Sequence, residues 1–179
     1  MNHETIINFW FKEIEQKSWW EKDAKFDRLV TDRFLTVHNA AIRCELYPWR
    51  EKPLGRLAEI IILDQFSRNI YRDDPLSFAY DPLALALAQE AISAKANESL
   101  VPARKAFLYM PFMHSESPAI HQRAMELFSE PGLESNLKFE IRHKAIIDRF
   151  GRFPHRNEIL GRKSTADEIS FLKETGSSF

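Results

Sequence analysis

Residues 23–44 read DAKFDRLVTDRFLTVHNAAIRC, and their apolar positions recur in steps of three and four. The apolar stripe consists of Phe26, Val30, Phe34, Val37, Ala41 and Cys44. This period is typical of an α-helix with one buried face, so Cys44 is expected to face the core. Asp23 precedes the stripe and can cap the first turn. The helix should end before Pro48, because a proline disfavours the α conformation in the residue before it.

The same period continues along the rest of the chain. Further helices are expected at residues 4–16, 54–66, 81–94, 102–110, 118–130, 137–150 and 165–174. No stretch has the pattern of a strand, and the chain contains only 5 glycines, which disfavours a turn-rich β protein. We therefore predict a single helical domain over residues 1–179, with about eight helices packed as antiparallel pairs.

Several helix ends carry specific signals. Asp81, followed by proline, is expected to cap a helix start. Pro111 should end or kink the helix that begins near residue 102. Gly151 is expected to end the helix at 137–150. Thr165 with Glu168 predicts a capping box at the last helix.

Composition narrows the class of protein and its partners. The formal net charge is −1, so neither nucleic acid nor an anionic membrane is an expected partner. The first 17 residues lack the core of a signal peptide, and no apolar run reaches the length of a membrane helix. One cysteine excludes an intrachain disulfide framework and fits a reducing compartment. We expect a soluble, cytoplasmic protein, and the sequence does not indicate its oligomeric state.

Residues 63–72, LDQFSRNIYR, form the first of three polar stretches that helix periodicity does not explain. Asp64 and Arg68 are four residues apart, as are Gln65 and Asn69, so each pair projects from one side of a helix. An apolar run that looks buried precedes them. Three interpretations stay open: a weak surface ion pair, a buried structural network and a ligand site.

Residues 109–117, YMPFMHSES, form the second stretch. Methionine and phenylalanine beside His114 and Glu116 are typical of a small-molecule pocket with polar groups at its mouth. His114 and Glu116 are candidates for general acid–base catalysis. The spacing of His114 and His121 matches no metal motif, so no metal or other cofactor is predicted. The alternative is structural: a satisfied core histidine, with Ser115 or Ser117 capping the next helix.

Residues 138–163 form the third stretch, where eight basic and three acidic residues give a formal charge of +5, against −6 for the rest of the chain. Arg149 precedes the expected helix end, and Arg152, His155 and Arg156 follow within a short turn. Asn157 is a candidate cap for a short helix at 158–160. Such a helix start would favour an anion. The alternative is a structural role, in which the arginines bind helix carbonyls or stabilise the helix dipole.

These stretches carry a resemblance to a known family. Residues 63–72, 107–116 (FLYMPFMHSE), 149–157 (RFGRFPHRN) and 176–179 (GSSF) resemble sequence blocks of an uncharacterised bacterial family, domain-of-unknown-function family 924. The resemblance covers nearly the whole chain. It implies an all-helical, tetratricopeptide-like superhelical fold, and it implies no function.

The leading hypothesis is a polar pocket on this helical scaffold for a small anionic ligand bearing phosphate or carboxylate. Hydrolase or transferase chemistry is compatible with it, although no nucleophile motif is present and whether the protein is an enzyme stays open. The candidate catalytic residues are His114, Glu116 and His155. The candidate ligand-binding residues are Asp64, Arg68, Asn69, His143, Arg149, Arg152 and Arg156.

The alternative from another class is a tetratricopeptide-like module that binds a protein or an acidic peptide without catalysis. Its arginines and histidines would be internal struts or clamps for acidic side chains. RNA binding through the basic stretch is weaker, because the rest of the chain is negative and aromatic residues are not interleaved with the basic ones.

Overall fold

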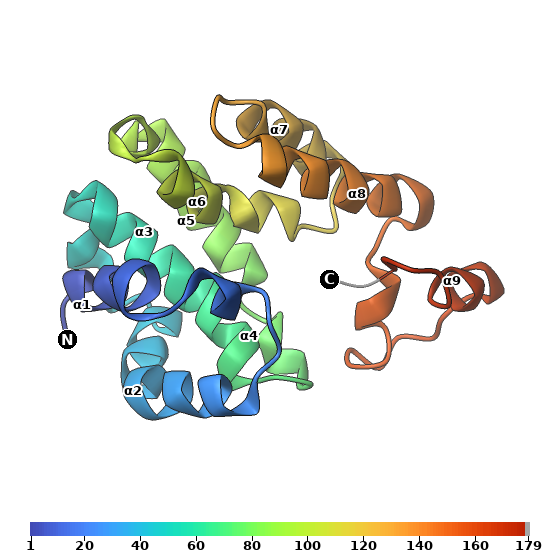
Figure 1. Ribbon diagram of the computed structural model, residues 1–179, viewed down its shortest axis with the longest axis horizontal. Coiled ribbons are helices and arrows are strands. Elements are labelled where there is room, and N and C mark those ends of the chain that lie inside the picture. Colours follow the sequence, from blue (N-terminus) through green and yellow to red (C-terminus); the bar gives the residue numbers. More distant parts are fainter. Residues whose placement is uncertain (178–179) are drawn as a thin grey trace.

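Helical segments follow one another along the computed structural model, which describes residues 1–177 (Figure 1). The α-helices are α1 (His3–Asn8), α2 (Ala24–Ile42), α3 (Pro53–Ile61), α4 (Ser67–Ile70), α5 (Asp81–Ser93), α6 (Pro102–Met113), α7 (Pro118–Phe128), α8 (Glu134–Phe150) and α9 (Ala166–Phe171). Two segments are π-helical, η1 (Phe9–Glu13) and η4 (Ile62–Phe66). The 3-10 turns are η2 (Gln16–Trp19), η3 (Tyr47–Glu51), η5 (Pro75–Ser77), η6 (Ala96–Ser99) and η7 (Pro154–Arg156). No strand occurs within residues 1–177, so the all-α prediction is confirmed.

Helix α2 forms where its apolar period predicts. The Asp23 carboxylate accepts a hydrogen bond from the Lys25 amide at 2.8 Å, which caps the first turn. The prediction for Cys44 is wrong: this residue is exposed and has a left-handed backbone, with φ of 57°. Helix α2 ends at Ile42, so Cys44 lies beyond the helix and outside its apolar stripe. Leu46, two residues further on, is buried.

Helix α3 continues through the π-helical turn η4 into α4. Every residue from 57 to 67 is buried, including Asp64 and Gln65. A π turn holds one residue more than an α turn, so it changes the direction in which the following side chains point, and such turns are frequent at functional sites. The buried stretch therefore directs two polar side chains into the interior.

The first helix is shorter than predicted. It ends at Asn8 and widens into η1, after which Ile14 is extended, with ψ of 152°. The wider turn accompanies burial of the adjacent rings of Phe9 and Trp10. The ring centroids of Phe9 and Phe34 lie 4.7 Å apart, and those of Phe34 and Phe66 4.9 Å apart. Packing of aromatic rings against α2 and η4 thus accounts for the irregular helix at residues 9–13.

The remaining helix ends partly match the predictions. Gly151 ends α8 with φ of 68°, and Thr165 with Glu168 forms the predicted capping box. Helix α6 continues past Pro111 to Met113, because this proline lies in the last turn. The short helix at 158–160 is absent, and Asn157 instead hydrogen-bonds Ser164 and Arg162 through its side chain.

The hydrophobic residues form two clusters. The larger contains buried residues from α1 through α7, and helices α5 to α8 pack successively against one another, with α7 and α8 side by side in Figure 1. The smaller contains Ile146, Ile147 and Phe153, with Phe150 and Phe171 packed on it. This packing is compatible with a tetratricopeptide-like array, which stays a prediction, as does the single-domain organisation.

No helix within residues 1–177 combines the length and the apolar character that crossing a bilayer requires.

His38 shows how α2 is joined to the start of α4. Its Nε2 lies 2.8 Å from the Ser67 hydroxyl, which donates its own proton to the Leu63 carbonyl at 2.7 Å. The hydroxyl therefore accepts from His38, whose Nε2 carries the hydrogen. Burial lowers the pKa of His38 to about 4, so this imidazole is neutral in the folded protein at neutral pH.

We predict that Gly55→Ala destabilises the protein by about 3 kcal/mol or more. A Cβ at this position would lie 2.0 Å from the Trp49 carbonyl oxygen, which is backbone and cannot move without displacing η3. Urea denaturation followed by circular dichroism measures the effect. Gly151→Ala is the control: it has nothing within 4 Å and should cost only about 1 kcal/mol for its positive φ. Equal costs would contradict the steric account.

We predict that unfolding free energy decreases as the pH is lowered from about 6.5 toward 4. In this window an unfolded His38 binds a proton that the folded protein excludes, so stability rises with pH. His38→Gln, which keeps a donor toward Ser67, should reduce this slope by up to about 1.4 kcal/mol per pH unit, the value for one proton. Urea titrations at a series of pH values test it, and an unchanged slope would show that His38 does not contribute.

Candidate functional site

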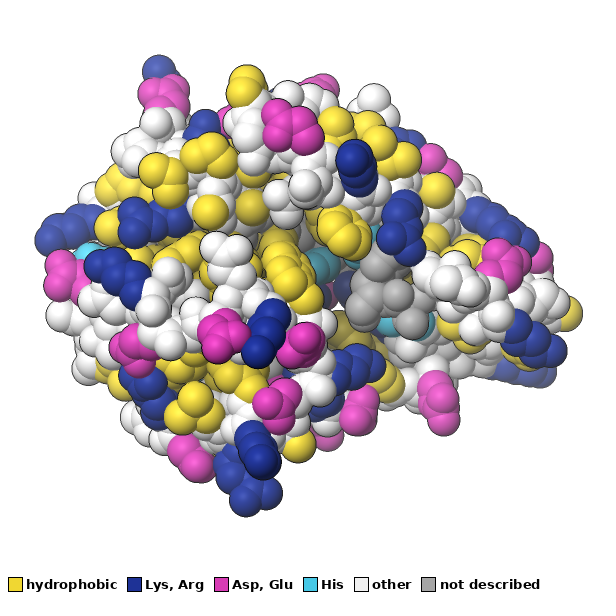
Figure 2. Space-filling model, in the orientation of Figure 1, with side chains coloured by type: hydrophobic (Ala, Val, Ile, Leu, Met, Phe, Trp, Pro, Cys, Tyr) yellow, Lys and Arg dark blue, Asp and Glu magenta, His cyan; other side chains and the backbone are white. Residues whose placement is uncertain are grey.

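The three polar stretches converge at the junction of the two hydrophobic clusters. Asp64 comes from η4, His114 directly follows α6, and Arg156 lies in η7, after α8. Asp81, at the start of α5, joins them through ion pairs. In Figure 2, histidine side chains are visible at the centre of the face, where the N-terminal helices meet the C-terminal segment. We call Asp64, Arg68, Asp81, His114 and Arg156 the junction cluster.

Asp64 and His114 form a hydrogen-bonded pair. The Asp64 Oδ1 lies 2.7 Å from the His114 Nδ1, and the Gln65 amide donates to the Asp64 Oδ2 at 2.5 Å. Arg68 also lies 3.4 Å from the Asp64 carboxylate. Burial alone would raise the pKa of Asp64, but His114 and Arg68 outweigh it and keep the pKa below its usual range. The buried-network interpretation of this stretch therefore holds, and the surface ion pair is excluded.

The ionised Asp64 determines the tautomer of His114. A carboxylate only accepts hydrogen bonds, so His114 must donate through Nδ1 and keep the lone pair on Nε2. Burial lowers the pKa of His114, and the Asp64 carboxylate opposes this shift only in part. The imidazole is therefore neutral at neutral pH, and 16% of its side chain is exposed. This is the arrangement of a general base held by a carboxylate.

Asp81 is shared by two arginines. Arg68 binds it through two parallel hydrogen bonds of 2.9 and 3.0 Å, and Arg156 binds the same carboxylate at 3.2 Å. The cap predicted for Asp81 is absent, because helix α5 includes this residue and its carboxylate is directed to the arginines. Asp81 thus bridges the two guanidinium groups, and Arg68 has the Asp64 carboxylate as a second partner at 3.4 Å.

Arg156 is the least compensated member of the junction cluster. The residue is 6% exposed, and its guanidinium lies over the rings of Phe78 and Phe153, 4.5 and 4.7 Å from their centroids. Its buried Nε has no hydrogen-bond partner among residues 1–177. Burial, together with the charge of Arg68, lowers the pKa of Arg156 to about 10 despite the attraction of Asp81. This Nε is a donor that an incoming acceptor could satisfy.

Glu116, the other candidate for general acid–base catalysis, pairs with Arg162 and not with His114. It accepts two hydrogen bonds from Arg162, at 2.7 and 2.9 Å, and one from the Phe153 amide at 2.7 Å. Burial would raise its pKa, but these donors lower it, so Glu116 stays ionised. Its role here is to hold the segment that carries Arg156 against the end of α6.

Three predicted ligand-binding residues lie in other ion pairs and hydrogen bonds. Arg149 pairs with Asp167 at 2.6 Å, and 46% of its side chain is exposed. Arg152 binds Glu168 through two hydrogen bonds of 2.6 and 2.7 Å. Asn69 donates to Asp27 at 2.9 Å. The structural interpretation fits these three residues, whereas Arg68 and Arg156 lie in the junction cluster.

Two further predicted histidines border the cluster. His143 is buried and lies 2.8 Å from the Phe139 carbonyl, and burial lowers its pKa to about 3. His155 packs near Phe153, and burial, with the charge of Arg156, lowers its pKa to about 4. Both imidazoles are therefore neutral near pH 7 and add polarity to the junction without adding charge.

A fourth histidine, His121, has a structural geometry. Its Nδ1 lies 2.7 Å from the Glu140 carboxylate and its Nε2 lies 2.8 Å from the Ser115 carbonyl. The Ser115 carbonyl can only accept, so the His121 Nε2 carries a hydrogen. The hydrogen bond between the His121 Nδ1 and Glu140 then contains one proton, which lies on either the imidazole or the carboxyl group. Burial raises the pKa of Glu140, against the opposing effect of His121. This pair links α7 to α8.

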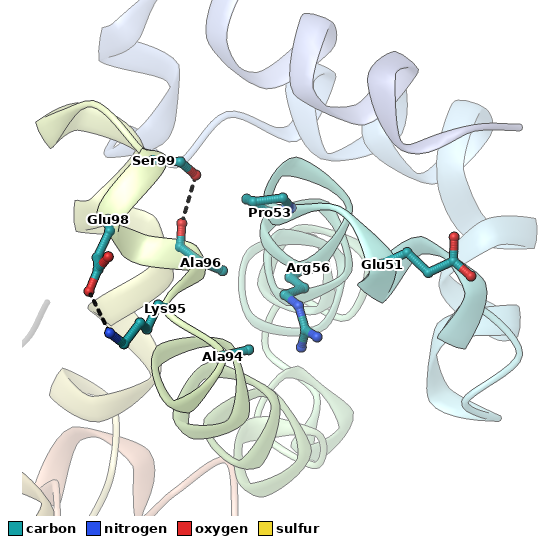
Figure 3. A pocket seen from close by; sticks show the side chains of 8 residues that line it. All are labelled: Glu51, Pro53, Arg56, Ala94, Lys95, Ala96, Glu98 and Ser99. Atoms are coloured by element: carbon teal, nitrogen blue, oxygen red, sulfur yellow. Dashed lines mark hydrogen bonds and ion pairs between the residues drawn. The ribbon is translucent and has the colours of Figure 1, made fainter.

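Two surface hollows lie away from the junction cluster. One, of about 430 Å³, is lined by Pro53, Arg56, Lys95, Glu98 and neighbouring residues (Figure 3). A second, of about 360 Å³, adjoins it and shares Pro53 and Ser99. The basic groups of the first are already paired, Arg56 with Glu90 and Lys95 with Glu98. In the described part of the chain, no three His, Cys, Asp or Glu side chains are grouped to hold a metal ion.

Sequence reasoning missed Asp81, Phe78 and Phe153 as members of the site. Asp81 precedes a proline, which is equally typical of a helix cap, and the two phenylalanines look like ordinary core residues. The arginines of the polar stretches, Arg68 and Arg156, were the available indication of Asp81. A buried guanidinium group requires a carboxylate partner.

The solved structures include a close relative. The structure of a protein of unknown function from Agrobacterium tumefaciens is similar to this chain, with 40% sequence identity, a TM-score of 0.91 and 96% of each chain covered. No curated protein matches the chain. The family model described as bacterial protein of unknown function (DUF924) matches residues 6–176. The chain therefore belongs to the DUF924 family.

Proposed function

We propose that this protein binds a small anionic ligand, bearing phosphate or carboxylate, beside Arg156, and that His114 exchanges a proton with it. The observation that carries this proposal is the state of Arg156. Its side chain is 8% exposed, and its one carboxylate partner among residues 1–177, Asp81, is shared with Arg68. A buried cation with an unpartnered Nε is costly, so an incoming anion gains a strong charge-assisted hydrogen bond.

The surroundings of Arg156 favour an anion that presents two oxygens. The rings of Phe78 and Phe153 pack against the guanidinium, which leaves its N–H groups as the part that binds a ligand. The edge of a guanidinium presents parallel N–H groups that match two oxygens of a carboxylate or phosphate. Arg68, held by the same Asp81, is the second cation of this site.

His114 supplies the chemistry that the site can perform. Asp64 holds its Nδ1 hydrogen, so Nε2 is available to accept a proton from a water molecule or a hydroxyl group. Hydrolysis or group transfer on the bound anion is compatible with this arrangement. Asp64 is a positioning residue, because it acts through His114.

The alternative is a module that binds a protein or an acidic peptide without catalysis. Its support is the adjoining pair of surface hollows near Pro53 and Ser99. Their basic groups already have carboxylate partners, so the junction cluster is the better candidate. Acidic peptide binding that is insensitive to substitution of Arg156 would support the alternative.

We predict that Arg156→Lys lowers the affinity for phosphate- and carboxylate-bearing compounds about tenfold or more. Lysine keeps the positive charge and the apolar stem but loses the fork of donors. A thermal-shift screen against both classes of compound identifies binders, and isothermal titration calorimetry then measures their affinity.

Arg149→Ala is the matched control, because Arg149 lies on the same basic stretch but pairs with Asp167 at the surface. It should leave anion affinity unchanged. If Arg156→Lys and Arg149→Ala bind every anion as the unmodified protein does, the proposed site is wrong.

We predict that anion binding takes up a proton at neutral pH. The pKa of His114 is lowered by burial, so the imidazole starts neutral, and a bound anion raises this pKa. Affinity should therefore increase as the pH falls, and calorimetry in buffers of different ionisation enthalpy should show an uptake of up to one proton. His114→Gln should abolish the uptake, whereas His3→Gln, remote from the cluster, should not. Equal uptake in both variants would exclude His114.

A further inference from the structure

Trp20 is exposed in a way that is unusual for tryptophan. It is 62% exposed, although tryptophans are generally well buried. The segment that presents it is anchored, because the Trp19 indole donates a hydrogen bond of 3.0 Å to the Trp10 carbonyl. The Trp20 ring lies nearly parallel to Phe107, with centroids 6.1 Å apart and an interplanar angle of 14°. The indole thus packs beside a buried ring, while most of its own surface faces solvent.

Helix α6 runs from Phe107, on which Trp20 packs, to the Asp64–His114 pair. Phe107, Met110 and His114 follow one another at steps of three and four, which places them on one side of α6. The Gln65 amide contacts the Met110 sulfur at 3.5 Å and also donates to Asp64. Seven residues of helix rise about 10 Å, so Phe107 lies about that far from His114 along the helix axis.

The other side of the same segment also reaches the junction. Lys22 is close enough to His155 for its charge to add to burial and Arg156 in lowering the pKa of that imidazole. The segment that presents Trp20 thus also brings a cation, Lys22, near His155. Figure 2 shows apolar side chains next to the histidines at the centre of this face.

We infer that the ligand of the junction cluster carries a planar aromatic or heteroaromatic group, separate from its anionic end, that stacks on Trp20. This inference rests on the proposed function and names the class of ligand within it. An indole presents a large, rigid apolar surface at low entropic cost. Inorganic phosphate and short aliphatic acids would bind only through the arginine end. Aryl-bearing acids and nucleotides combine both ends.

The test uses two pairs of compounds that differ in the aromatic group. The first pair is AMP and ribose 5-phosphate, and the second is 4-phenylbutyrate and butyrate. The aromatic member of each pair should bind more tightly. Trp20→Ala should weaken the aromatic member roughly 5- to 150-fold, the range for loss of one stacking contact, and leave the other member unchanged. Affinities are measured by isothermal titration calorimetry with the full-length chain.

Two further variants separate stacking from a loss of folding. Trp20→Phe keeps an aromatic ring and should retain most of the affinity for AMP, while the quenching of tryptophan fluorescence by AMP decreases. Tyr47→Ala removes another exposed aromatic side chain, 67% exposed and in η3, and should change neither affinity.

The outcomes distinguish the two proposals. If both members of each pair bind equally, Trp20→Ala has no effect and Arg156→Lys still weakens binding, the aromatic inference is overturned and the anion site stands. If no compound binds, or binding is insensitive to Arg156→Lys, the anion site fails and the aromatic inference falls with it.

Discussion

The carboxylate of Asp81 is the contact on which the junction depends. It binds Arg68, which follows the π turn, and Arg156, which follows α8, so it joins the N-terminal helices to the C-terminal segment. Glu116 makes the second such joint by binding Arg162 and the Phe153 amide. The two hydrophobic clusters therefore meet through charged groups that are half-buried, apart from the buried Arg156, and the position of Arg156 follows from both contacts.

Buried ion pairs are a weak explanation for stability. The cost of removing charges from water often exceeds what their attraction returns, and apolar residues of similar volume frequently serve as well. Arg156 illustrates the problem, because it is buried, repelled by Arg68 and incompletely hydrogen-bonded. Its contacts with two aromatic rings and with Asp81 nevertheless hold its guanidinium in place. An energetically costly but well-oriented cation is what an anion site requires.

Much of the fold could be predicted from the sequence, and less of the site. The apolar period of α2, the Thr165 cap and the Gly151 helix end depend on neighbouring residues, so local patterns reveal them. The three polar stretches were recognisable because periodicity left them unexplained. The residues that pair with these stretches could not be recognised from the sequence. Asp81 and Arg156 are 75 residues apart, and only tertiary packing brings them together. The π turn at Asp64 likewise depends on packing, since nothing in the local pattern separates it from an ordinary helix.

The charge of the junction cluster explains why histidine is placed there. Arg68 and Arg156 are balanced by Asp64 and Asp81, so with a neutral His114 the cluster carries no net charge. A ligand anion would therefore add an uncompensated negative charge to a buried site, which is unfavourable unless a proton arrives with it. His114 can accept that proton on Nε2 while Asp64 holds Nδ1. Binding and protonation are thus coupled by the composition of the site, and a bound ligand would meet an imidazolium ready to return the proton to a leaving group.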